Sequence, residues 1–128
     1  MYRMLAVAWL VGWAAFSVPW SSFTTRPEVG QVNLIPFSKA RRADQVRNFL
    51  YYVPAGALGI GLGFGPVATL AGATGLSAAA EATQIFSRNR FPAATDLMLN
   101  SAGALVGVGL AMAARWRRLT APATPIPD

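Results

Sequence analysis

Residues 48–86 decide the fold: NFLYYVPAGALGIGLGFG (48–65) is followed directly by PVATLAGATGLSAAAEATQIF (66–86). Each half is an almost uncharged apolar run, long enough to cross a hydrocarbon core about 30 Å thick as a helix. The stretch GFGP at 63–66 joins the two runs, and glycine and proline at such a junction predict a tight turn. The sequence therefore predicts two antiparallel transmembrane helices here.

Two further apolar runs flank this pair, at residues 4–20 and 96–114. The first could instead be a cleaved signal peptide, but its tryptophans and its poor cleavage site favour a retained helix. We therefore predict an all-α fold, an integral membrane bundle of four transmembrane helices at about 4–20, 48–65, 66–86 and 96–114. This domain spans residues 1–118, and a disordered Pro-rich tail follows at 119–128.

The composition excludes several classes of function. Only 12% of the residues are charged, and the chain has no cysteine and no histidine. Zinc sites, imidazole catalysis and thiolate chemistry are therefore excluded, and we predict no metal and no cofactor. The net charge of +6 comes from basic residues dispersed between apolar runs, so the chain lacks the continuous basic face that nucleic-acid binding needs.

Small residues recur at intervals that suit helix packing in lipid. Pairs of glycines four residues apart let helix backbones approach closely where lipid supplies no hydrophobic drive. We expect such contacts at the pairs Gly59 and Gly63, Gly61 and Gly65, and Gly103 and Gly107.

The orientation in the membrane is not decided by charge. The loops at 21–47 and 87–95 carry more positive residues than the termini, which would place the loops in the cytoplasm. Arg3 before the first run and three arginines at 115–118 are, however, typical of cytoplasmic termini. We favour cytoplasmic termini and leave the opposite orientation open.

Polar side chains within the apolar runs are the first candidates for a functional site, because ionisable groups inside a membrane are costly. Glu81 lies deep in the third run, with Gln84 one turn later on the same face. Asp96 and Asn100 lie one turn apart on a stripe of the fourth run that also holds two glycines. Asn48, at the start of the second run, is placed to cap that helix or to hydrogen-bond across the bundle, and the two roles are compatible.

Arginines at the loop ends complete the predicted site, because a guanidinium binds phosphate or carboxylate through two hydrogen bonds. We expect Arg42, Arg47 or Arg90 to meet an anionic head group. A structural salt bridge of Arg90 with Glu81 or Asp96, and a helix-capping role for Asp96, are the alternatives. The predicted ligand-binding residues are Glu81, Gln84, Arg90, Asp96, Asn100, Asn48 and Arg47.

Three motifs in order resemble the VanZ-like family of small bacterial membrane proteins. They are NLIPF at 33–37, N-x3-Y-x-P-x-G at 48–56, and E-x2-Q-x-F-x3-R-x5-D-x3-N-x2-G-x3-G at 81–107. The resemblance implies a multi-pass protein of the bacterial plasma membrane. The type member is associated with low-level resistance to the glycopeptide teicoplanin. Ala93 and Thr95 stand where the family commonly carries acidic residues, so a carboxylate cluster for a divalent cation is not implied.

Three functions remain open from the sequence. The first is a non-enzymatic protein whose polar cluster binds an anionic lipid, a cell-envelope precursor or a glycopeptide. The second is a structural or accessory membrane subunit whose polar residues only hold the helices together. The third is an intramembrane enzyme on a lipid-linked substrate, with Glu81 and Asp96 as an acid/base pair. We favour the first, with membrane lipids as partners; the sequence does not determine the oligomeric state.

Overall fold

The computed structural model describes residues 1–37 and 42–121, and over these ranges the chain is helical. A short 3₁₀ helix at Val29–Gln31 lies in the first loop, and the described residues form no strand beyond two isolated bridges. The all-α prediction is therefore confirmed. The four α-helices are α1 (Tyr2–Ser17), α2 (Arg42–Gly61), α3 (Pro66–Gln84) and α4 (Ala94–Thr120).

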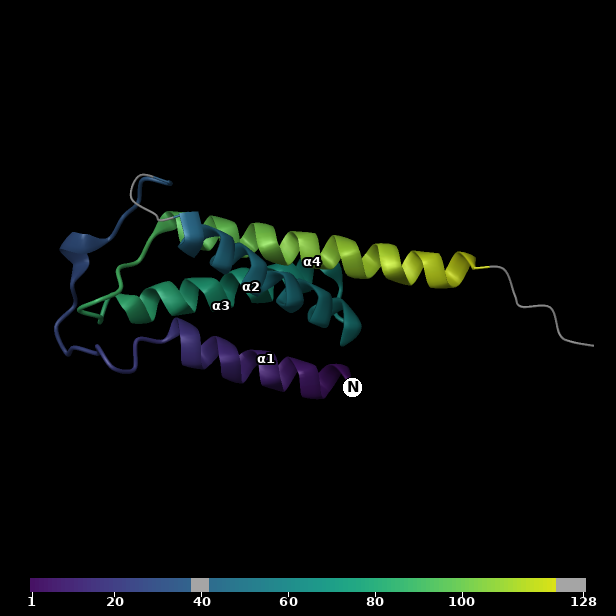
Figure 1. Cartoon of the computed structure of the whole chain (residues 1–128), viewed down its shortest axis with the longest axis horizontal. Coiled ribbons are helices and arrows are strands. Elements are labelled where there is room, and N and C mark those ends of the chain that lie inside the picture. Colours follow the sequence, from purple (N-terminus) through teal and green to yellow (C-terminus); the bar gives the residue numbers. More distant parts are fainter. Residues whose placement is uncertain (38–41, 122–128) are drawn as a thin grey trace, which may run out of the picture.

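The helices run alternately up and down along one long axis (Figure 1). The end of α1, the start of α2, the end of α3 and the start of α4 therefore lie together at one end of the bundle. The N-terminus and the α2–α3 turn lie toward the other end, and α4 extends beyond it. The most extensive contact is between α2 and α4, whereas α1 contacts mainly α2.

Glycines allow α2 and α4 to pack closely. A Cβ atom on Gly103 would overlap the main-chain carbonyl of Phe49, and one on Gly107 would overlap that of Val53. The expected contact at this pair is therefore present. Gly56, which the spacing argument did not single out, faces α4 in the same way.

In the other two glycine pairs, Gly59 and Gly61 make packing contacts, whereas Gly63 lies in the α2–α3 turn. Gly59 lies against Thr69 and Gly61 against the ring of Tyr2. Gly63 has a φ of +94°, in the left-handed region that favours glycine, and a Cβ on it would meet open space. Gly63 thus serves the α2–α3 turn, as the GFGP sequence indicates, and not a helix contact.

Several helix ends differ from the predicted spans, and three of them have a clear cause. α1 ends at Ser17, because Val18 precedes Pro19 and the residue before a proline disfavours helix. α2 begins at Arg42 and not at residue 48, because its first turns are charged and hydropathy does not detect them. α4 continues to Thr120, so residues 119 and 120 are helical and not part of a disordered tail. Ala121 follows as the C-cap of α4, and residues 122–128 of that predicted tail lie outside the described residues.

The first loop packs against the connection between α3 and α4. The main-chain N–H of Thr24 donates to the carbonyl of Phe86 at 2.8 Å, and that of Asn33 donates to Pro92 at 2.9 Å. The N–H of Phe37 donates to Oγ1 of the buried Thr95 at 2.7 Å. These bonds hold the loop over the end of the bundle where the starts of α2 and α4 meet.

Of the described helices, α4 alone is both long and apolar enough to cross a membrane. Only 28% of its apolar stretch is buried inside the molecule, whereas the core helix of a soluble protein would be mostly buried. This exposure agrees with a helix that faces lipid.

Candidate functional site

An open cavity of about 830 Å³ lies at the end of the bundle where the first loop meets the α3–α4 connection. All seven residues predicted from the sequence line it, so the structure brings the whole predicted set together. They come from α2 (Arg47 and Asn48), α3 (Glu81 and Gln84), the α3–α4 connection (Arg90) and α4 (Asp96 and Asn100).

Glu81 is tied to the start of α4. Its Oε2 accepts a hydrogen bond of 2.7 Å from the main-chain N–H of Ala93, the residue that precedes α4. The carboxylate therefore satisfies a polar group at a helix N-terminus, where negative charge is also favoured by the helix dipole. Gln84, one turn further along α3, is only 7% exposed.

Asp96 and Asn48 pair across the bundle. The Asn48 side chain lies beside the Asp96 carboxylate and interacts with it. The capping alternative for Asn48 is wrong, because α2 begins at Arg42 and Asn48 lies inside the helix. Asp96 is also not the N-cap of α4, since that position is Ala93; it lies in the first turn, where the helix dipole favours a carboxylate.

Two hydrogen bonds join helices next to the cavity. Asn100 Nδ2 on α4 donates to Oγ of Ser77 on α3 at 2.8 Å, and Trp13 Nε1 on α1 donates to the hydroxyl of Tyr52 on α2 at 2.8 Å. Ser77 also lies beside the Tyr52 hydroxyl, so the two bonded pairs are neighbours. Asn100 is 7% exposed, and its Oδ1 is a buried acceptor without a partner among the described residues. A ligand in the cavity could donate to this oxygen.

The two arginines of the cavity are held differently. Arg47 forms a salt bridge of 3.0 Å with Asp44, and its guanidinium lies 5.5 Å from the centre of the Phe16 ring. Arg90 donates through one guanidinium nitrogen to the main-chain carbonyl of Phe16. Within the described part of the chain Arg90 forms no salt bridge, so the structural pairing with Glu81 or Asp96 is not present.

This leaves a positive group facing the cavity with most of its hydrogen-bond donors free. A guanidinium has five N–H donors, and the described contacts of Arg90 use a single nitrogen. The arrangement can therefore bind a phosphate or carboxylate through two hydrogen bonds. The nearby carboxylates of Glu81 and Asp96 can accept hydrogen bonds from hydroxyl or amide groups.

Several lining residues were not predicted as part of the site. Asn33 and Tyr52 belong to the motifs that carry the family resemblance, so the sequence held a signal for them. Asp44 is an ordinary loop carboxylate in the sequence, and only the early start of α2 brings it to the cavity. The remaining lining residues are Phe16, Ser17, Gly30, Tyr51, Ala80, Asn89, Phe91 and Ala93.

Comparison with known proteins gives one result. A family model described as VanZ/LLP1 matches residues 2–115, which include every residue that lines the cavity. No curated protein and no solved structure matched the chain.

Proposed function

The chain belongs to the VanZ/LLP1 family, and we propose that it is a multi-pass protein of the bacterial plasma membrane in which all four helices cross the bilayer. Exposed apolar side chains on the outside of α1 and α4 support this proposal, because soluble monomers rarely expose such large apolar surfaces. They include Met4 (77% exposed), Val7 (60%), Val11 (64%), Leu105 (57%) and Leu110 (60%).

We further propose that the cavity binds the polar head group of an anionic lipid or cell-envelope precursor. One observation carries this proposal: Arg90 lines a polar cavity without a carboxylate partner among the described residues. The Arg90 side chain is half-buried, and Glu81 and Asp96 attract it without forming a salt bridge with it, so most of its N–H donors remain free to bind an anion. A phosphate or carboxylate of the ligand would bind these donors.

The cavity also contains hydrogen-bond acceptors that donors on the ligand would satisfy. Glu81 and Asp96 carry acceptor oxygens beyond the Glu81 oxygen that Ala93 uses, and the Oδ1 of Asn100 has no described partner. A head group that combines an anionic group with hydroxyls or amide N–H groups would satisfy both sets of protein groups. Lipid-linked sugars, amino sugars and peptides, including a glycopeptide, have this chemistry.

The second candidate is a structural or accessory subunit without its own ligand. The interhelical hydrogen bonds of Asn100 with Ser77 and of Thr74 with Ser101 favour it, since polar residues can serve helix packing alone. In that case the effect of a cavity variant on any phenotype would follow its effect on stability.

Two arginines on the same connection provide the test. Arg90 lines the cavity, whereas Arg88 is exposed and does not. Lipids that co-purify with the wild type, Arg90→Gln and Arg88→Gln would be quantified by mass spectrometry at matched folding. We expect an enriched anionic lipid or precursor in the wild type and in Arg88→Gln, and its loss in Arg90→Gln. Equal lipid profiles in all three proteins would contradict ligand binding.

A link to antibiotic resistance follows if the ligand is a cell-wall precursor. Expression of the wild-type protein in a susceptible host should then change the inhibitory concentration of teicoplanin, and Arg90→Gln should not. An unchanged concentration with the wild type, at normal protein level, would contradict the resistance function.

A further inference from the structure

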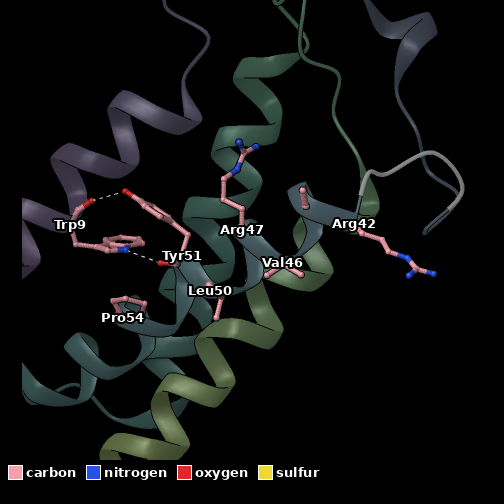
Figure 2. Close-up of a pocket in the computed structure, with 8 residues that line it drawn as sticks. Trp9, Arg42, Val46, Arg47, Leu50, Tyr51 and Pro54 are labelled. Carbon is pink, nitrogen blue, oxygen red and sulfur yellow. Dashed lines mark hydrogen bonds between the residues drawn. The ribbon is translucent and has the colours of Figure 1, made fainter.

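A second concave surface lies between α1 and α2, next to the polar cavity. This groove has a volume of about 760 Å³, and its walls are mostly apolar (Figure 2). Arginines of α2 lie toward one end, and Pro54 lies toward the other. The residues that line it are Trp9, Arg42, Ala43, Val46, Arg47, Leu50, Tyr51 and Pro54.

Hydrogen bonds between Trp9 of α1 and Tyr51 of α2 hold the side of the groove where the two helices meet. Trp9 Nε1 donates to the main-chain carbonyl of Tyr51 at 2.9 Å, and the Tyr51 hydroxyl donates to the carbonyl of Trp9 at 3.5 Å (Figure 2). The two ring centres are 5.8 Å apart. Because their polar atoms are used between α1 and α2, the rings offer hydrocarbon surface to a ligand.

The groove and the polar cavity are continuous. Arg47 and Tyr51 line both of them. On α2 the two lie side by side, since the cavity is lined from Asp44 to Tyr52 and the groove from Arg42 to Pro54. On α1 the cavity is lined by Phe16 and Ser17, whereas the groove reaches Trp9, about 10 Å further from the cavity end at a rise of 1.5 Å per residue. A hydrocarbon chain that leaves the cavity beside Tyr51 would run along the groove in this direction.

We infer that the groove binds the hydrocarbon chain of a membrane lipid whose anionic head group lies in the polar cavity. The inference rests on the proposed function and adds that the ligand is an amphiphile held at both ends, and not a free anion or a soluble glycopeptide. Charge supports the assignment, because Arg42 lies at the cavity end of the groove and forms no salt bridge within the described residues.

Two leucines provide a matched test by groove filling. Leu50 lines the groove and is 58% exposed, whereas Leu105 lies on the outside of α4 and is 57% exposed. Leu50→Trp and Leu105→Trp would be purified beside the wild type and Arg90→Gln, and bound lipid per protein would be measured by mass spectrometry. We expect Leu50→Trp to lose the enriched anionic lipid and Leu105→Trp to retain it at the wild-type level.

The outcomes separate this inference from the proposed function. Lipid retained in Leu50→Trp but lost in Arg90→Gln would overturn the chain-binding groove and leave head-group binding in place. No enriched lipid in the wild type would overturn both proposals.

Photo-cross-linking keeps the test valid if Leu50→Trp does not fold. p-Benzoylphenylalanine would be placed at position 50 or position 105, and the lipid adducts would be identified by mass spectrometry. We expect position 50 to capture the anionic lipid above its share of the membrane, and position 105 to capture lipids in their bulk proportions. Bulk proportions at position 50 would overturn the inference.

Discussion

Glu81 on α3 and Ala93 at the start of α4 are joined by a hydrogen bond of 2.7 Å, from the main-chain N–H of Ala93 to Oε2 of Glu81. The bond closes the α3–α4 connection and places the carboxylate at the positive end of a helix dipole. Glu81 therefore has a structural contact as well as a place in the cavity. Variants that test its function must preserve this contact.

Two substitutions of Glu81 separate the contact from the charge. In Glu81→Gln the side-chain carbonyl can still accept from Ala93, so the free energy of unfolding should remain close to that of the wild type. Glu81→Leu leaves the Ala93 N–H unpaired and should cost about 1–3 kcal/mol. Unfolding in detergent measures both. If both variants lost the same free energy of unfolding, the hydrogen bond with Ala93 would not be the source of the stability that Glu81 provides.

Ser77→Ala tests helix packing without changing the residues that line the cavity. The variant loses the acceptor of Asn100 Nδ2, and interhelical hydrogen bonds in membranes contribute about 0.6 kcal/mol each. We expect a small loss of stability and unchanged lipid content by mass spectrometry. A fall in bound lipid as large as that caused by Arg90→Gln would favour the accessory-subunit function.

The close approach of α2 and α4 predicts different effects at two glycines of α4. A side chain at Gly107 would overlap the Val53 carbonyl, whereas Gly109 faces open space. Gly107→Leu should therefore destabilise the bundle by about 1–3 kcal/mol or prevent folding, and Gly109→Leu should fold normally. Thermal unfolding in detergent distinguishes them. Similar unfolding temperatures would contradict the tight α2–α4 contact.

The four-span arrangement can be tested with single cysteines, because the natural chain has none. With cytoplasmic termini, Thr25→Cys and Asn89→Cys should react with a membrane-impermeant thiol reagent from outside the cell. Phe64→Cys, in the α2–α3 turn, should be protected until the membrane is opened. The reverse pattern would invert the orientation but keep four spans. Labelling of all three positions from the same side of the membrane would contradict the four-span arrangement.

The helices and the main site residues could be predicted from the sequence, because apolar runs and regular spacings mark them. Apolar runs located all four helices, and the four-residue spacing of Gly103 and Gly107 identified a packing face that contacts α2. The polar residues within these runs stood out because few charged groups surround them. For that reason Glu81, Asp96 and Asn100 could be grouped before the structure placed them around one cavity.

The partners of those residues could not be predicted from the sequence. Ala93 contributes a main-chain N–H, which no side-chain pattern reveals, and Ser77 is one of many small residues on α3. The start of α2 was also missed, because charged residues can extend a helix beyond an apolar run. This extension moved Asn48 from a capping position to one that faces Asp96.

The central claim, that the polar cavity binds an anionic lipid or precursor, is tested most directly by the lipids that co-purify with the wild type and with Glu81→Gln. The two proteins should have equal folding stability, so a difference in lipid content would report the site and not the fold. We predict that an anionic lipid enriched in the wild type is lost in Glu81→Gln, because the amide NH₂ group replaces the carboxylate oxygen that accepts hydrogen bonds from the head group. Identical lipid profiles in two equally folded proteins would contradict the claim.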